Sequence, residues 1–222
     1  EHAIQLLLQE CITENFDGFV LDFSYLHFSG YGGAIRRLIK SIGYEFHAKQ
    51  KEIILVVPPF IPQYPLFTAD DYKELHDYVD QFIIMTYDYS STNRSPKGGP
   101  SAPTNWMMQS VLNLLPPSMR KEEKHKLLLG LNFFGTTFCE EGSTPILGNQ
   151  FIELLETFQP TLKWSQEDQE HSFSYSYDEL EWTAYFPTLK YIDERLKLAE
   201  SLGVGISVWE LGQGLDYFYD LF

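Results

Sequence analysis

The sequence predicts an α/β fold in which a parallel sheet is covered by helices. Short apolar runs alternate with longer amphipathic stretches along the chain, which is the order expected of consecutive βα units. The apolar runs are nearly continuous and do not alternate with polar residues, as in strands that are covered on both faces. Five such runs are expected to be strands: residues 18–23, 53–57, 82–86, 127–132 and 204–208.

Amphipathic helices are expected between these strands, because apolar residues recur there at intervals of three and four. In the stretch 34–48 the apolar stripe consists of Ile35, Leu38, Ile39 and Ile42. The helix at 189–202 is expected to end at Gly203. Further helices are expected at residues 2–14, 69–78 (with Thr68 or Asp70 as the cap), 105–115, 150–158 and 215–222.

Residues 160–187 break this alternation, since they are polar and aromatic. Phe173, Tyr175 and Tyr177 alternate with polar residues, which is typical of a strand with one covered face. The segment therefore predicts a small β-hairpin inserted into the α/β domain.

Composition limits the partners of the chain. Its 222 residues are 44% hydrophobic, which indicates a globular protein with a sizeable core. The net charge of −15 argues against nucleic acid and against an anionic membrane surface, because both require clustered Lys and Arg. No apolar run is long enough for membrane insertion.

The two cysteines, Cys11 and Cys139, lie too far apart in the sequence to supply a metal site. We therefore expect no metal and no other cofactor. The pair could form one disulfide or remain two buried thiols, and both alternatives stay open.

The strand at 18–23 contains one residue that its apolar pattern does not explain. Side chains alternate between the faces of a strand, so Val20, Asp22 and Ser24 share one face. Burying a carboxylate is costly unless it is paired, which makes Asp22 the first candidate for a functional role.

This stretch resembles the signature of the family 18 glycoside hydrolases, the chitinases and their relatives. That signature is Asp-Gly-x-Asp-x-Asp-x-Glu, on the fourth strand of a (β/α)8 barrel. Asp17 and Gly18 match its start and Asp22 matches its last Asp, whereas Val20 replaces the middle Asp. Ser24 stands where the family has its general acid, and a serine cannot supply that proton at ordinary pH. The resemblance therefore implies a protein without catalytic residues that does not hydrolyse sugars.

Other motifs of this family follow at the ends of later strands, where a (β/α)8 barrel carries its functional groups. Tyr87 and Asp88 close a Met-x-Tyr-Asp motif, and Trp209 stands where the family has the Trp beneath the central sugar ring. Asn132 lies in a segment similar to the family's Gly-Leu-x-x-Tyr-Gly, and Glu210 follows Trp209. The resemblance implies that these residues, together with Asp22 and Ser24, bind an oligosaccharide.

Each candidate also has a purely structural interpretation. Trp209 could pack in the core, and Tyr87 with Asp88 could form a hydrogen-bonded corner. Asp22 could be a paired relic, and Glu210 an ordinary loop carboxylate, which is the interpretation we favour for it.

The five strands align with the fourth to eighth strands of the family barrel. Residues 1–222 are therefore expected to be one barrel domain that lacks its first three strands, as a fragment would, with the hairpin at 160–187 as an insertion.

Residues 185–189 and 203–220 are similar to the stabilin-interacting, chitinase-like branch of the family. This similarity implies a secreted and lysosomal lectin whose ligands are chitooligosaccharides and lipopolysaccharide, and whose partner is a stabilin-type scavenger receptor. The net charge of −15 fits lipopolysaccharide phosphate poorly. Two alternatives remain: an active glycosidase with a relocated acid, Glu210 or Asp88, and a receptor-binding scaffold with a vestigial cleft.

Overall fold

The computed structural model describes residues 2–23, 32–90, 95, 98–115 and 121–222. The chain divides into two compact units. Unit 1 comprises residues 1–85, 109–129 and 203–205, and unit 2 comprises residues 86–108, 130–202 and 206–222.

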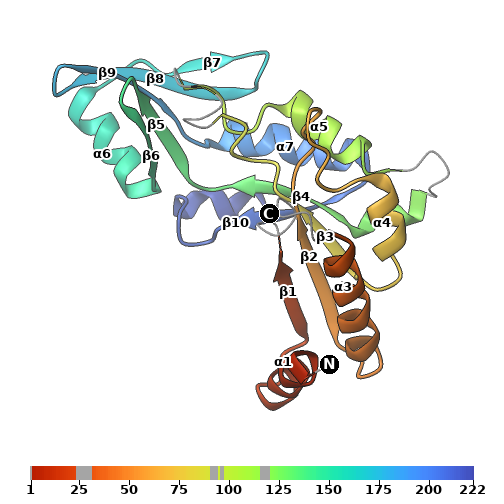
Figure 1. Cartoon of the computed structure of the whole chain (residues 1–222). Helices are drawn as coiled ribbons and strands as arrows, with labels where there is room; N and C mark the ends of the chain where they lie inside the picture. The colour runs from red at the N-terminus through yellow and green to blue at the C-terminus, as the bar shows by residue number, and fades with distance from the viewer. Residues whose placement is uncertain (1, 24–31, 91–94, 96–97, 116–120) are drawn as a thin grey trace. The chain divides into compact units, whose positions relative to one another are not determined.

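The five predicted strands form one sheet, with the order β1-β2-β3-β4-β10 (Figure 1). Their bounds are β1 (Gly18–Asp22), β2 (Glu52–Val57), β3 (Gln81–Ile84), β4 (Leu127–Asn132) and β10 (Gly205–Trp209). Strands β1 and β2, β2 and β3, and β3 and β4 pair in parallel. The predicted α/β fold is therefore confirmed, with strand ends within two residues of the predicted ones.

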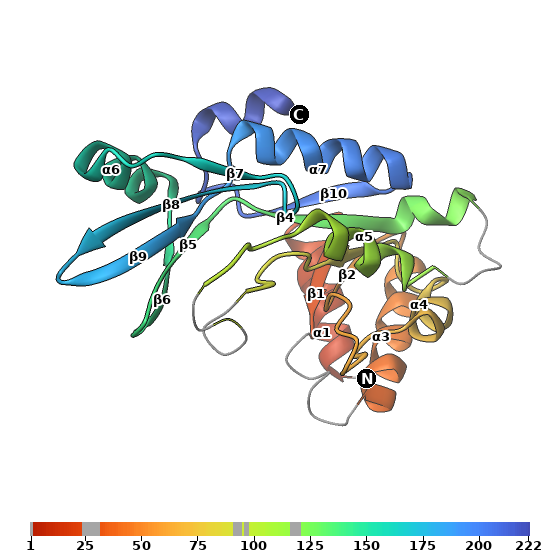
Figure 2. The same ribbon diagram turned by 90° about the horizontal axis from the view of Figure 1, so that it is seen from above.

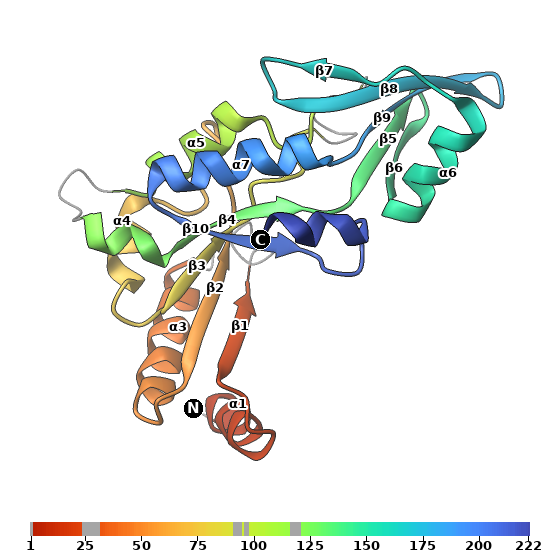
Figure 3. The same cartoon turned by 180° about the vertical axis from the view of Figure 1, so that it is seen from behind.

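Helices of unit 1 cover one face of its strands. Helix α3 (Gly32–His47) lies beside β2 (Figure 3), and its Ile39, Ile42 and Phe46 are buried. Helix α1 (His2–Thr13) packs on α3. Helix α4 (Ala69–Leu75) begins at Thr68, which is the cap: its hydroxyl accepts a hydrogen bond from the amide of Asp71.

Strand β1 differs from the continuously buried strand that its sequence suggested. Leu21 is buried and Phe19 packs edge-on against Phe46, but Val20 is 57% exposed and Asp22 is exposed as well. Among the described strands only β2 pairs with β1, and Phe19 and Leu21, which share the face opposite Val20 and Asp22, are half-buried and buried. The face of Val20 and Asp22 therefore remains open to solvent in the structure.

Unit 2 contains a second, antiparallel sheet with the order β6-β5-β9-β8-β7. Its strands are β5 (Gly135–Cys139), β6 (Gly142–Ile146), β7 (Lys163–Ser165), β8 (Glu170–Tyr177) and β9 (Leu180–Tyr185). The hairpin predicted at 160–187 is present as β8 and β9, but β7 extends it on one side and β5 with β6 on the other. The insertion is therefore a five-stranded sheet, larger than the predicted hairpin.

Helix α6 (Gly148–Phe158) lies along these antiparallel strands (Figure 2), and Phe151 stacks on Phe186 at 4.3 Å between ring centres. The remaining helices are α5 (Thr104–Leu112), α7 (Leu189–Leu202) and two 3-10 helices, Lys121–Lys126 and Asp216–Leu221. The predicted tail helix is the second of these, and its Phe218 is buried edge-on against Phe133.

Cys11 and Cys139 are two buried free thiols, so the structure favours the second of the two alternatives left open by the sequence. Within the described residues, no helix has the length and apolar character needed to cross a membrane.

Candidate functional site

The residues singled out from the sequence lie at the carboxyl ends of the parallel strands. Asp22 ends β1 in unit 1. Unit 2 holds the others: Tyr87 and Asp88 follow β3, Asn132 ends β4, Trp209 ends β10, and Glu210 comes next. Ser24 lies outside the described residues. The ends of parallel strands are where a barrel of this class places its functional groups.

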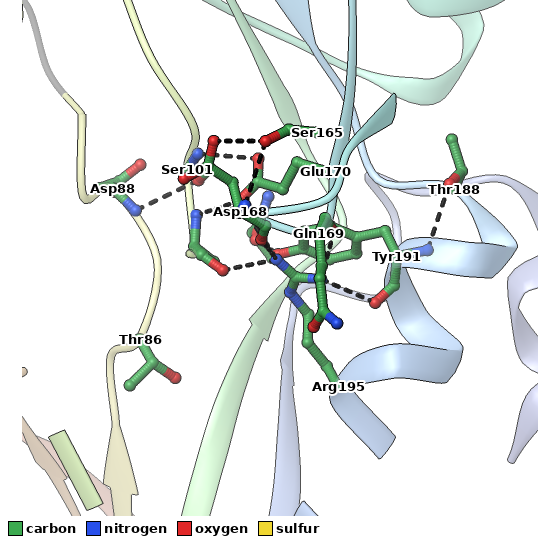
Figure 4. Close-up of polar contacts among 12 residues, drawn as sticks. Thr86, Asp88, Ser101, Ser165, Asp168, Gln169, Glu170, Thr188, Tyr191 and Arg195 are labelled. Atoms are coloured by element: carbon green, nitrogen blue, oxygen red, sulfur yellow. Dashed lines mark hydrogen bonds and ion pairs between the residues drawn. The ribbon is translucent and has the colours of Figure 1, made fainter. Parts of the chain in front are cut away.

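The segment after β3 is fixed by hydrogen bonds from both sides. The Thr86 hydroxyl donates to the carbonyl of Gly130 at 2.8 Å, which joins the ends of β3 and β4. Asp88 has a positive φ of 60°, and its amide donates to the hydroxyl of Ser101 at 3.3 Å (Figure 4). The backbone at Tyr87 and Asp88 thus forms a hydrogen-bonded corner, as the structural interpretation of these two residues expected. That corner nevertheless leaves the Asp88 side chain exposed.

Asn132 does not present its amide to solvent. The side chain is buried, its Nδ2 donates to the carbonyl of Phe134 at 2.7 Å, and its Oδ1 accepts a hydrogen bond from the Tyr191 hydroxyl. The expectation that Asn132 contacts a sugar stays a prediction. In the structure its hydrogen bonds fix the end of β4.

Tyr191 is held in a buried polar cluster that the sequence analysis missed. Burial raises the pKa of Tyr191, and the nearby Asp88 carboxylate acts in the same direction, so the phenol stays protonated and donates its hydrogen bond. The guanidinium of Arg195 lies over the Tyr191 ring, 3.4 Å from its centre.

Glu170 and Arg195 form the centre of this cluster (Figure 4). One Glu170 oxygen accepts from the amide of Ala102 at 2.6 Å and lies 3.3 Å from Arg195 Nη2, while the other accepts from the amide of Ser101 at 3.0 Å. Burial raises the pKa of Glu170, against the opposing effects of Arg195 and the two amides. The Glu170–Arg195 pair thereby fixes the segment that contains Ser101. The hydroxyl of Ser101 in turn accepts the hydrogen bond from the amide of Asp88.

The sequence did contain a signal for this cluster. Tyr191, Ile192, Arg195 and Ala199 form the buried stripe of α7. An arginine inside an otherwise apolar stripe is rarely buried unless it is paired. The position of its partner, Glu170, depends on strand pairing and could not be inferred from helical spacing.

Trp209 is not a core residue. Its indole is 54% exposed at the end of β10, while its carbonyl accepts from the amide of Phe133 at 2.7 Å. The backbone is therefore anchored to the chain after β4 and the ring remains available. The core-packing interpretation of Trp209 is wrong.

Glu210 is exposed and follows a cis peptide bond. Its carbonyl accepts from the amide of Gln213 at 3.2 Å, which closes a turn. This placement agrees with an ordinary loop carboxylate.

In unit 2 the strand ends thus present a half-exposed indole at Trp209, a partly exposed phenol at Tyr87 and a carboxylate at Asp88. Such groups can stack on the apolar face of a pyranose ring and accept hydrogen bonds from its hydroxyl groups. Within the part of the chain that the structure describes, no group of three His, Cys, Asp or Glu side chains is placed to hold a metal ion.

Sequence comparison identifies the family. The sequence model for "Glycosyl hydrolases family 18" matches residues 3–214, which is nearly the whole chain, and the chain therefore belongs to this family.

Curated relatives include the "Cortical fragment-lytic enzyme" of Bacillus anthracis, which is 25% identical over 156 residues, covering 66% of this chain and 34% of that enzyme. The enzyme of the same name from Bacillus subtilis (strain 168) is 25% identical over 179 residues, covering 75% and 40%. The chain thus spans well under half the length of these relatives.

Solved structures share the fold. A chitinase from Chromobacterium violaceum ATCC 12472 superposes with a TM-score of 0.83 at 20% identity, covering 98% of this chain and 68% of that one. A Bacillus megaterium QM B1551 spore cortex-lytic enzyme gives a TM-score of 0.80 at 17% identity, covering 98% and 51%.

Proposed function

We propose that this family 18 protein is a lectin-like member that binds a saccharide at its strand ends and does not hydrolyse it. The observation that carries the proposal is the exposed Trp209 ring on an anchored backbone. An apolar platform with a few fixed polar groups is the usual composition of a sugar site. Tyr87 and Asp88 supply polar groups from the end of another strand in the same unit.

The absence of hydrolysis is proposed from the sequence. Serine at position 24 cannot donate the proton that the leaving oxygen of a glycoside requires. Asn132 would contact a ligand only with its remaining hydrogen-bonding capacity, because its amide already bonds Phe134 and Tyr191.

The ligand class follows from the relatives. The names of the matched proteins specify chitinase and spore cortex-lytic activities, and we propose a chitooligosaccharide-type ligand for this chain. The similarity of residues 203–220 to chitinase domain-containing protein 1, the stabilin-interacting chitinase-like protein, supports secreted or lysosomal binding and a stabilin-type receptor as proposals of finer detail. Lipopolysaccharide fits less well, because its phosphates would meet a chain of net charge −15.

The test is calorimetric titration of chitotetraose into the full-length protein, followed by analysis of the mixture for cleavage products. We expect binding without cleavage, and loss of most of that binding in Trp209→Ala. Trp164→Ala is the matched control. Trp164 lies on β7, away from the strand ends, and packs against His171 and Lys190. Unchanged affinity in a folded Trp209→Ala variant would overturn the placement of the site.

An active glycosidase is the second candidate, since the named relatives are hydrolases. It requires a relocated acid, and the exposed Glu210 is the first to examine. Cleavage of chitotetraose that is lost in Glu210→Gln would establish this alternative. If chitotetraose is neither bound nor cleaved, that result would favour the receptor-binding scaffold.

A further inference from the structure

Unit 2 contains a groove that includes none of the strand-end residues described above. It lies between α6 and the β8–β9 hairpin and has a volume of about 540 Å³. Four aromatic residues contribute to its lining: Phe158, Tyr175, Tyr177 and Trp182.

The aromatic rings form a surface along the groove. Tyr175 and Trp182 are directly opposite each other in the hairpin and are stacked, with ring planes 14° apart and centres 6.3 Å apart. Phe158 packs on Tyr175 at 4.7 Å from the helix, so Tyr175 contacts a ring on either side. Trp182 Nε1 donates to the carbonyl of Tyr177 at 3.3 Å and so fixes the indole.

Helix packing alone does not account for this surface. Away from the hairpin turn, Phe151 and Phe173 continue the aromatic layer between α6 and the sheet, and both are buried. There the helix and the sheet are closely packed. Toward the hairpin turn the layer opens, and Tyr177 is 62% exposed. The outer rings therefore remain accessible where the inner ones form a core.

The α6 wall of the groove is mixed. Gln150, Glu153 and Thr157 line it together with the apolar Leu154, and their spacing of three and four residues places the polar three on one face. They offer an amide, whose oxygen already accepts from the amide of Leu147 at 2.8 Å, a carboxylate and a hydroxyl. A partner helix with an apolar face would leave the carboxylate and the hydroxyl without hydrogen bonds, at an energetic cost. A ligand that carries hydroxyl groups on its edges would satisfy them.

Charge disfavours an anionic ligand. Residues 148–158 and 170–185, which supply most of the lining, contain no Lys or Arg, and Glu153 is the charged residue among those that line the groove. A polyanion would be repelled here, whereas a neutral ligand would not.

We propose that this groove is a second saccharide-binding site, in which a neutral N-acetylhexosamine chain packs against Tyr177 and Trp182 and hydrogen-bonds to Gln150, Glu153 and Thr157. The choice of a saccharide rests in part on the proposed function, because the ligand class is shared. The groove itself shares no residue with the strand-end site. It would give the protein a second contact with the same polymer, and two linked contacts raise the effective affinity for a long chain.

The experiment compares Tyr177→Ala, Trp182→Ala, Trp209→Ala and the control Trp164→Ala in the full-length protein. Binding of chitotetraose is measured by titration calorimetry, and retention on insoluble chitin by sedimentation. We expect two binding events in the unaltered protein, one of which is weakened about tenfold or lost in Trp182→Ala and Tyr177→Ala. Retention on chitin should fall in the same variants and remain in Trp164→Ala.

The two proposals fail in different ways. If Trp209→Ala removes all chitotetraose binding, while Tyr177→Ala and Trp182→Ala bind like the unaltered protein, the groove is not a site. If binding depends on Trp182 but not on Trp209, the groove stands and the strand-end site fails. Absence of any chitotetraose binding would overturn both. Tyr177 is largely exposed, so Tyr177→Ala should fold and keep the test valid if Trp182→Ala does not.

Discussion

The guanidinium of Arg195 lies flat over the ring of Tyr191, 3.4 Å from its centre, while the hydroxyl of that ring donates to the buried amide of Asn132. Arg195 also binds Glu170, which holds the amides of Ser101 and Ala102. One buried cluster thus connects the end of β4 with the segment that fixes Asp88. Most predictions below follow from this arrangement.

Tyr191→Phe should lower the free energy of unfolding by about 1–3 kcal/mol, because it leaves the Oδ1 of Asn132 buried without its donor. Urea denaturation at pH 7 measures this change. The variant should keep its fold, since the ring that stacks under Arg195 is retained.

The same substitution should alter the pH dependence of stability. Burial raises the pKa of Tyr191, so the folded protein keeps a proton that the unfolded chain releases above pH ~10. The stabilising contribution is therefore complete below that pH, and it declines by up to ~1.4 kcal/mol per pH unit above it. Denaturation at pH 9 to 11 should show a steeper decline in the unaltered protein than in Tyr191→Phe. Parallel curves would contradict this prediction.

Glu170→Gln should destabilise the protein by about 3–5 kcal/mol, because it leaves the buried Arg195 charge without its counter-ion. The double variant Glu170→Gln with Arg195→Met should be less destabilised than the sum of the single variants. A double-mutant cycle by urea denaturation checks this. Additivity within about 0.5 kcal/mol would mean that the two side chains do not interact appreciably.

Two glycines of α3 should respond in opposite ways to alanine. A Cβ at Gly43 would lie 2.1 Å from the carbonyl oxygen of Tyr78, so Gly43→Ala forces backbone apart and should cost about 1–3 kcal/mol. A Cβ at Gly33 meets only the ends of the Arg37 and Arg36 side chains, at 3.7 and 4.0 Å, and Gly33→Ala should stabilise the helix by up to ~1 kcal/mol. Thermal unfolding of the two variants gives the comparison.

Periodicity predicted the parallel sheet because its strands are short apolar runs between helices that each have one apolar stripe. It could not predict β5 and β6, where Gly142 and Pro145 stand among small polar residues. Strand β6 pairs with β5, and β5 pairs with β9, whose partner residues lie 45–49 positions further along the chain. Such pairing leaves no local pattern.

The candidate site could be predicted only in part, because contacts between distant segments leave no local pattern there either. Motif positions identified which residues lie at strand ends, and the exposure of Trp209 agrees with a binding role. They did not reveal that the buried amide of Asn132 hydrogen-bonds to Tyr191 and Phe134. Which groups face solvent is decided by contacts between distant segments, and Glu170 with Arg195 is the clearest example.

The hydrogen bonds that Glu170 accepts join residues 68 and 69 positions apart, and the bond from Arg195 to the carbonyl of Ala102 joins residues 93 positions apart. Long chain loops must close before such contacts can form, so they are expected late in folding, after the local β8–β9 hairpin. Contacts that form after the transition state affect mainly the rate of unfolding. The Glu170–Arg195 pair would then slow unfolding, and its loss would shorten the lifetime of the folded state without slowing its formation.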